Sequence, residues 1–181
     1  GVYVKMPVFS FSKLKKVDTV LGPEMKSTGE IIGKDVNLPK ALYKGFIASG
    51  VHVPDYGTAL MTVSDKDKAE VIPLAKRLIS LGYHIVATTG TGKALEEEGI
   101  KVDVIEKINE NSNDILDAIR DGRINLVVNT MTEGKTSETD GFLIRREAVE
   151  NNIPCLTSLD TAEALLQAME TIHFQLEDMS K

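Results

Sequence analysis

Residues 88–93 (Thr-Thr-Gly-Thr-Gly-Lys) bring together three hydroxyl groups, two glycines and one ammonium group. They follow an apolar run over residues 83–87 and precede a short helix that we expect to begin at Ala94. Glycine permits backbone angles closed to other residues and lets amide N–H groups approach a ligand. Free N–H groups at a helix start favour phosphate. The stretch therefore predicts an anion-binding turn, with a tight strand-to-helix turn capped by threonines as the alternative.

Polar side chains also follow the other predicted strands. In open parallel sheets, ligands bind beyond the carboxyl ends of the strands. The candidates that gather at this edge are Thr62, Ser64, Asp65, Lys66, Lys68, Thr88, Thr89, Gly90, Thr91, Lys93, Glu106, Lys107, Asn129, Thr130 and Thr132. Each lysine alone could be a solvated surface charge. Together, the hydroxyls, the amide and the lysines predict a site for a small phosphorylated ligand.

Catalysis has weaker support in the sequence. The carboxylates that could reach the same edge as a general base are Asp65, Asp67, Glu106 and Asp140. No Ser/His/Asp grouping or nucleophile elbow accompanies them. We expect His84 to pack within its strand or against a helix, and Cys155 to be a small core residue. The three histidines lack metal-ligand spacing, so no catalytic residue and no metal site are predicted.

Composition narrows the class of protein. The chain has 181 residues, 42% of them hydrophobic and 27% charged, with a net charge of −6. These values are ordinary for a globular protein, and the acidic balance argues against nucleic-acid binding. No apolar run approaches the roughly 20 residues of a membrane span, and the first residues do not resemble a signal peptide. A single cysteine fits a reducing compartment, so we expect a cytoplasmic protein.

Residues 57–181 alternate between strand and helix patterns. The predicted strands are Ala59–Ser64, Tyr83–Ala87, Val102–Ile105, Ile124–Thr130 and Pro154–Thr157. The predicted helices are Lys66–Leu81, a short one ending at Gly99, 114–121 capped by Asn113, Asp140–Asn151, and a long terminal one capped by Asp160. The apolar face of the first helix is expected to hold Ala69, Ile72, Ala75, Leu78 and Ile79. This alternation predicts an α/β fold, a five-stranded parallel sheet in a Rossmann-like α/β/α sandwich.

Residues 1–56 differ in character and predict a small α+β unit. Two strand pieces are expected on either side of Pro7, followed by a turn-rich stretch over residues 20–30. A helix then opens near Asn37, with Pro39 in its first turn, and stops near Gly50. The unit is too small to be stable alone and has the character of the end of a larger domain, with a boundary at residue 56.

Several segments carry a family resemblance. They are 59–64 (Ala-Leu-Met-Thr-Val-Ser), 87–91 (Ala-Thr-Thr-Gly-Thr), 128–130 (Val-Asn-Thr), 144–146 (Ile-Arg-Arg), 8–14 and 21–30. The first four resemble the methylglyoxal-synthase-like family, and within it the C-terminal allosteric domain of carbamoyl phosphate synthetase large subunits. The last two resemble the end of that subunit's second ATP-grasp domain. The resemblance implies an ATP-grasp remnant with a linker over 1–56 and a methylglyoxal-synthase-like allosteric domain over 57–181.

The resemblance also implies a function. The parent ligase makes carbamoyl phosphate from bicarbonate, glutamine and ATP, for pyrimidine and arginine synthesis. Its terminal domain binds an effector such as UMP, with IMP or phosphoribosyl pyrophosphate as further candidates. Positions that match the family's effector site are Thr62, Lys68, Thr88, Thr91, Lys107 and Asn129, flanked by Thr89, Gly90 and Thr130. The parent uses ATP and Mg²⁺, whereas no cofactor is implied for this chain.

The expected partners are the rest of the large subunit and the small glutaminase subunit, with a homo-oligomer as a further option. Three other functions stay open. Methylglyoxal synthase is similar in the Thr/Gly stretch, but its Gly-Gly-Asp-Gln-Gln segment has no counterpart in residues 131–136. The purine-pathway cyclohydrolase resembles residues 62–66 but not the chain from Ile108 onward. A non-regulatory oligomerisation module is the third.

Overall fold

The computed structural model describes residues 1–8, 29–106, 114–130 and 140–178. Its strands are β1 (Val2–Val8), β2 (Gly29–Asp35), β3 (Gly57–Thr62), β4 (Tyr83–Thr88), β5 (Asp103–Ile105), β6 (Leu126–Asn129) and β7 (Cys155–Leu156). Its helices are α1 (Leu38–Ala48), η2 (Asp65–Asp67), α2 (Lys68–Ser80), α3 (Thr89–Glu97), α4 (Asp114–Arg120), α5 (Asp140–Glu150) and α6 (Leu159–Asp178). Residues 20–28 of the predicted turn-rich stretch, the cap at Asn113 and residues 131–136 lie outside the described residues, whereas Gly29 and Glu30 begin β2.

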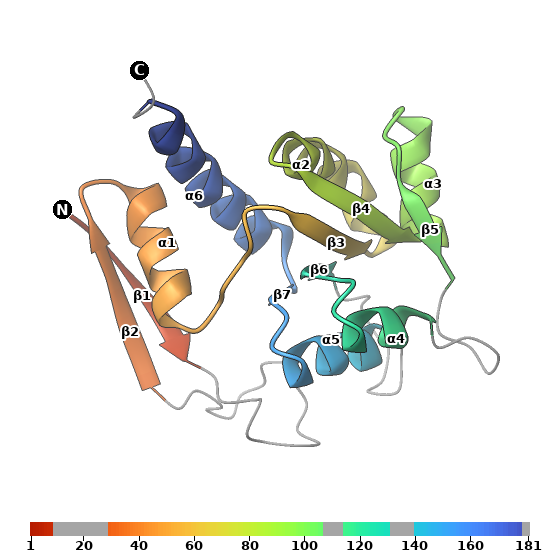
Figure 1. Cartoon of the computed structure of the whole chain (residues 1–181), viewed down its shortest axis with the longest axis horizontal. Helices are drawn as coiled ribbons and strands as arrows, with labels where there is room; N and C mark the ends of the chain where they lie inside the picture. Colours follow the sequence, from red (N-terminus) through yellow and green to blue (C-terminus); the bar gives the residue numbers. More distant parts are fainter. Residues whose placement is uncertain (9–28, 107–113, 131–139, 179–181) are drawn as a thin grey trace.

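The predicted five-stranded parallel sheet is confirmed. Its strand order is β5-β4-β3-β6-β7, and all four pairings are parallel. Helices lie on both sides of it, with α2 and α6 on one side and α4 and α5 on the other (Figure 1). The order places β3, the first strand of the sheet, at its centre.

Two apolar cores flank the sheet, because neighbouring residues of a strand point to opposite faces. Met61 and Val128 belong to the larger core, which includes side chains of α2, α3 and α6. Leu60 and Val127 belong to the smaller core under α4 and α5. Strands buried on both faces are nearly continuous apolar runs, which is why the sequence identified them.

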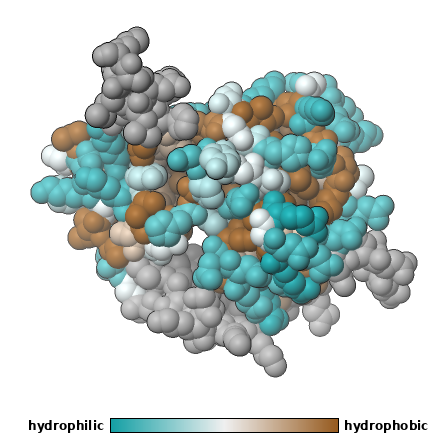
Figure 2. All heavy atoms as spheres, viewed as in Figure 1, coloured by the Kyte–Doolittle hydropathy of each residue, from teal (hydrophilic) through white to brown (hydrophobic). Residues whose placement is uncertain are grey.

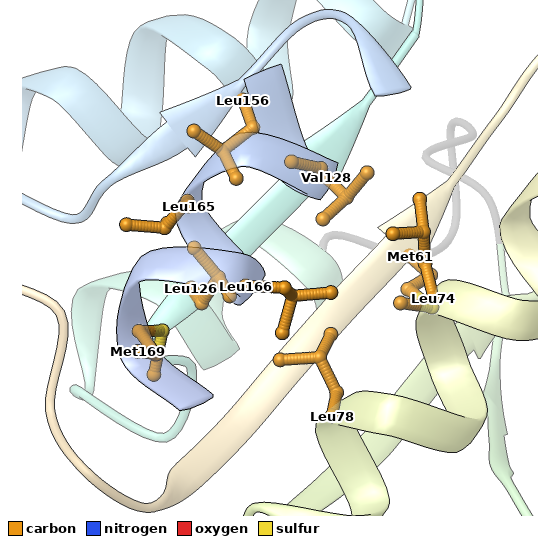
Figure 3. Close-up of a pocket in the computed structure, with 10 residues that line it drawn as sticks. Met61, Leu74, Leu78, Leu126, Val128, Leu156, Leu165, Leu166 and Met169 are labelled. Atoms are coloured by element: carbon orange, nitrogen blue, oxygen red, sulfur yellow. The ribbon is translucent and has the colours of Figure 1, made fainter. Parts of the chain in front are cut away.

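The larger core contains a small gap. About 10 Å³ of space lies between the sheet and the helices α2 and α6. Its lining is apolar, and in Figure 3 the side chains of Leu78, Leu166 and Met169 converge on it from the two helices. A space of this size holds at most about one water molecule and needs polar partners to do so. It is a packing defect of the core.

The N-terminal unit forms a two-stranded antiparallel sheet with α1 beside it (Figure 1). The predicted break at Pro7 is wrong, because Pro7 lies within β1 opposite Glu30. A two-stranded sheet has only edge strands, where a missing N–H is tolerated. Gly33 brings β2 against α1, since a Cβ there would lie 2.1 Å from the Ala41 carbonyl oxygen. The Asn37 side chain caps α1, as predicted, by accepting a hydrogen bond from Lys40 N.

Helix α1 joins this unit to the rest of the molecule. It packs against α6, and Phe46 belongs to the larger core. The Tyr83 hydroxyl donates to the carbonyl of Pro54, which fastens the connecting segment to β4. Ile32 of the small sheet and Val36, which follows β2, are exposed, and Figure 2 shows brown spheres in this area, at the left. The domain boundary at residue 56 stays a prediction.

Three predicted features of the helices are corrected. Helix α2 begins at Lys68, after the 3-10 turn η2, and its buried side chains include Val71 and Leu74, whereas Ala69 is exposed. Helix α6 begins at Leu159, and the Ser158 hydroxyl, not Asp160, accepts the capping bond from the Thr161 N–H. Helix α3 includes the Thr/Gly stretch itself. In each case the helix start differs by two to five residues from the start that the sequence pattern predicts.

His84 and Cys155 differ in their exposure to solvent. His84 is exposed, contrary to the prediction, and its Nε2 lies 2.8 Å from an oxygen of Asp103 on the neighbouring strand. Cys155 packs against the smaller core as predicted, and burial raises the pKa of its thiol to about 12. Within the part of the chain that the structure describes, no helix has the length and apolar character needed to cross a membrane.

Candidate functional site

The sheet register brings the predicted polar residues to one edge. Thr62 ends β3 directly opposite Asn129, which ends β6. Thr88 ends β4 beside Ile105, the last residue of β5. Thr130 follows Asn129, and its N–H donates to the Thr62 carbonyl at 3.3 Å. The predicted Lys107 and Thr132 lie outside the described residues.

The Thr/Gly stretch is the first turn of a helix rather than a turn before one. Thr88 is at the N-cap position in extended conformation, and its side chain makes no capping hydrogen bond. Gly90 and Gly92 do not have positive φ angles, so the expectation that they supply special backbone angles is wrong. Gly92 serves close packing instead, since a Cβ there would lie 2.9 Å from a methyl group of Val104.

The start of α3 carries a positive field. The first N–H groups of a helix have no partner within the helix, and the aligned peptide dipoles make this end positive. No acidic residue lies in the first turn. The ammonium group of Lys68 is held over the same turn, 3.5 Å from the position that a Cβ of Gly90 would take. These groups form an anion-attracting corner between α2 and α3.

Two lysines near this corner differ in placement. Lys68 is partly enclosed, with 31% of its side chain exposed, and pairs with Asp65 at 2.7 Å. Lys93, which belongs to the Thr/Gly stretch, is 79% exposed and lies 4.0 Å from Glu97 on the outer side of α3. The ammonium group at the corner is therefore that of Lys68.

Thr91 fastens the corner to the centre of the sheet. Its hydroxyl oxygen accepts a hydrogen bond from Val63 N at 3.1 Å, and the residue is only 1% exposed. The hydroxyl still has a proton to donate. Thr88 is likewise buried, whereas Thr89 is exposed. Of the three threonine side chains in the stretch, Thr88 and Thr91 are therefore buried, and Thr89 is at the surface.

A second polar network holds the loop after β3. Ser64 N donates to the Thr130 hydroxyl at 2.9 Å, and the Ser64 hydroxyl donates to Asp67 Oδ2 at 2.6 Å. Hydrogen bonds from Ser64 and Thr130 hold the pKa of Asp67 below its usual value, although partial burial opposes them. Asp67 is therefore ionised at neutral pH and is a weak base. This network positions the loop that leads into Lys68.

Arg145 is a buried residue that the site reasoning missed. It lies on α5, is 6% exposed, and its Nη1 donates to Asn129 Oδ1 at 2.7 Å. Its Nε is buried and has no hydrogen-bond partner among the described residues. The signal available in the sequence was an arginine at the helical spacing of the apolar positions Ile144 and Ala148, which are both buried.

The described residues contain no group of three or more His, Cys, Asp or Glu side chains that could hold a metal ion. The edge instead gathers helix N–H groups, hydroxyls, an ammonium group and an amide as donors, beside the carboxylates of Asp65 and Asp67. Donors of this kind bind the oxygens of phosphate. Chemically, the edge can bind and orient an anion.

Comparisons with known proteins agree with this fold. Residues 70–157 match the family model described as the MGS-like domain. The crystal structure of methylglyoxal synthase from Elizabethkingia anophelis NUHP1 is similar, with a TM-score of 0.53 and 20% identity over 63% of this chain and 79% of that one. The crystal structure of ForH has a TM-score of 0.48 and 22% identity over 64% and 79% of the two chains. The predicted methylglyoxal-synthase-like α/β fold is confirmed.

Proposed function

We propose that this chain is a regulatory domain that binds a nucleotide effector, UMP or a related nucleotide, chiefly through the effector's phosphate. The observation that carries the proposal is the corner at the start of α3. There the Lys68 ammonium group lies over the first helical turn, and that turn contains no acidic residue. A phosphate carries close to two negative charges near neutral pH, so charge-assisted hydrogen bonds dominate its binding.

The neighbouring strand ends supply the remaining contacts. Thr62 and Asn129 stand side by side in the register, which supports the proposal that they meet the sugar of a nucleotide whose phosphate occupies the corner. The proposed set of effector-binding residues is completed by Thr88, Thr89, Gly90, Thr91, Thr130 and Lys107. The parent protein is proposed from the resemblance of residues 8–14, 21–30 and 59–64 to be a cytoplasmic carbamoyl phosphate synthetase. Its large subunit would contain this domain and would pair with a glutaminase subunit.

Lyase activity is the alternative, because the fold is also that of methylglyoxal synthase. Such a reaction needs a base beside the phosphate site. The carboxylates placed there are poorly suited, since Asp67 has a lowered pKa and Asp65 pairs with Lys68. Incubation with dihydroxyacetone phosphate tests the alternative directly. We expect no methylglyoxal above the protein-free control, and sustained product formation would replace the effector proposal.

Calorimetry with UMP and uridine tests the effector proposal. UMP should bind, and uridine, which lacks the phosphate, should bind hardly at all. Losing one charge-assisted contact costs on the order of 1.5–3 kcal/mol, or about ten- to a hundredfold in affinity. We expect losses in this range for Lys68→Ala, Thr91→Ala and Lys107→Ala.

Lys93→Ala is the matched control for the lysine variants, because Lys93 is on the outer side of the same helix. It should leave the affinity for UMP unchanged. Thr91→Ala also removes the acceptor for Val63 N, so its stability is measured in parallel. Equal affinity for uridine and UMP, or equal losses in the Lys68 and Lys93 variants, would show that the phosphate is not held at this corner.

A further inference from the structure

We propose that Arg145 is a positioning residue, which orients the side-chain amide of Asn129 so that its Nδ2 donor faces the bound ligand. The inference rests on the proposed function, because it concerns the same edge of the sheet. It starts from the contact between the two side chains, in which Arg145 Nη1 donates to Asn129 Oδ1 at 2.7 Å. Both residues are buried, at 6% and 1% exposure.

The chemistry of the contact fixes the orientation of the amide. A guanidinium group has only donors, whereas an asparagine amide has an oxygen that accepts and a nitrogen that donates. Turning the Asn129 amide over would place two donors against each other in a buried space, at the cost of an unmade hydrogen bond. The oxygen therefore stays toward Arg145, and Nδ2 is left as the donor that the amide can offer to another group.

The choice of an amide over a carboxylate is informative. The buried guanidinium of Arg145 has a neutral partner and an Nε without a partner among the described residues. An aspartate at position 129 would neutralise it better, because buried charges are stabilised by pairing. It would also place a negative charge beside the phosphate corner. Asparagine keeps this edge free of that charge and presents a donor instead.

The backbone brings the pair together from two rigid elements. Asn129 ends a central strand, and Arg145 comes from the middle of α5, an 11-residue helix. Gly141, one turn earlier on α5, makes room for the contact. A Cβ there would lie 3.1 Å from Arg145 Nη1 and 3.4 Å from Asn129 Oδ1. Such a supported donor selects ligands that offer an oxygen acceptor at this point, such as a phosphate or sugar oxygen.

The experiment measures UMP affinity and unfolding in urea for four variants of the full chain. Arg145→Met removes the donor, and we expect a loss of about tenfold in UMP affinity. Arg145→Lys keeps a donor and should recover part of that loss. Asn129→Asp should remain folded and lose more affinity than Arg145→Met, because its carboxylate repels the phosphate. Arg146→Met, at the adjacent arginine that pairs with Glu150 near the surface, should bind UMP normally.

A spectroscopic measurement separates positioning from a general structural role. The Asn129 side-chain amide signals in a nitrogen-15 correlation spectrum are identified by their absence in Asn129→Asp. In the unsubstituted protein, UMP should shift these signals, and in Arg145→Met the shift should be largely lost. If Arg145→Met is folded and binds UMP normally, or shows the same shift, the positioning role is wrong. If the unsubstituted protein itself fails to bind UMP, the proposed function is what fails.

Discussion

Two arginines, one on each side of the sheet, show how differently the two layers use a positive charge. Arg77 on α2 contacts two carboxylates of α6, with Nε 2.8 Å from Glu170 Oε1 and Nη1 2.5 Å from Glu163. Hydrogen bonding to Glu170, and then to Glu163, raises its pKa above the usual value. Arg145 on α5 is more deeply buried, and among the described residues its hydrogen-bond partner is the neutral Asn129. A charge neutralised within the fold supports the fold, whereas one that bonds a neutral amide among the described residues is available to organise a site.

The surroundings of the two arginines differ in the same way. Beneath Arg77, the side chains of α2 and α6 that line the small gap seen in Figure 3 are apolar. Around Arg145, the strand ends carry an amide and hydroxyls at the open edge of the sheet. Substitutions in the first region should therefore change stability without changing ligand affinity. Those in the second should change affinity more than stability.

The largest effect on stability is expected from Leu78→Ala in the α2–α6 layer. Leu78 is 2% exposed and lines the gap, so truncation enlarges an existing void. Removing a buried leucine side chain costs about 2–5 kcal/mol of unfolding free energy. Urea unfolding measures the loss. Ile79→Ala is the matched control. Ile79 is next to Leu78 in the sequence, but its side chain is 41% exposed, so its truncation should cost far less unfolding free energy. A large loss of UMP affinity in folded Leu78→Ala would contradict the separation of the two regions.

The next effect concerns the two glycines of α3. Gly92→Val should destabilise by about 1–3 kcal/mol, because the new side chain overlaps Val104 on β5. Gly90→Ala should leave stability unchanged or raise it, since the nearest atom would be the mobile end of Lys68 at 3.5 Å and alanine favours helix. Thermal unfolding of both variants checks the contrast. Equal destabilisation would mean that the glycines have a shared backbone role after all.

Much of the fold could be predicted because it follows from the local pattern of apolar residues. The central strands are short apolar runs, and the parallel sheet follows from their alternation with helices. The edge that gathers Thr62, Thr88 and Asn129 also followed, since carboxyl ends of parallel strands meet at one edge. What sequence patterns determine well is which residues are buried along a strand.

The remaining features depend on tertiary contacts. The start of α3 was placed too late, because its first turn contains glycine and threonine, which favour helix weakly. It is held in helical form by contacts such as Val63 N to the Thr91 hydroxyl. Arg145 was missed as a site residue because its partner, Asn129, is 16 residues away on a strand. Nothing in the local pattern predicts that pairing.

A smaller effect is expected from Arg77→Met, which removes the ion pairs between α2 and α6. Arg77 is 29% exposed, so solvent weakens the interaction, and we expect a cost of about 1 kcal/mol or less. The cost should shrink at high salt, which urea unfolding at two ionic strengths would show. UMP affinity should not change. A loss of UMP affinity comparable to that of Arg145→Met would contradict the conclusion that Arg77 supports the fold and Arg145 supports the ligand site.

The smallest effect should be the pH dependence contributed by Asp67, and it tests whether the loop network acts as a structural support. The folded-state pKa of Asp67 is lowered, first by the Ser64 hydroxyl and then by Thr130. A lowered pKa means that its stabilisation is present above the unfolded value of roughly 4 and is lost as pH falls through the folded value. Ser64→Ala removes the larger of these hydrogen bonds.

Near neutral pH, Ser64→Ala should therefore be less stable than the unsubstituted protein by about 1 kcal/mol or less. For a chain of this size, that corresponds to a shift in Tm of roughly 2–4 °C or less. The difference should narrow as pH falls from about 4, the unfolded value, through the lowered folded-state pKa of Asp67, because the stabilisation is lost as the carboxylate becomes protonated. Thermal unfolding from pH 7 to pH 3 measures it, with Ser80→Ala, an exposed helix position, as the control. A difference that stays constant across this range would mean that the Ser64 hydroxyl stabilises the loop independently of the charge on the Asp67 carboxylate, because Ser64→Ala keeps the backbone N–H that donates to Thr130.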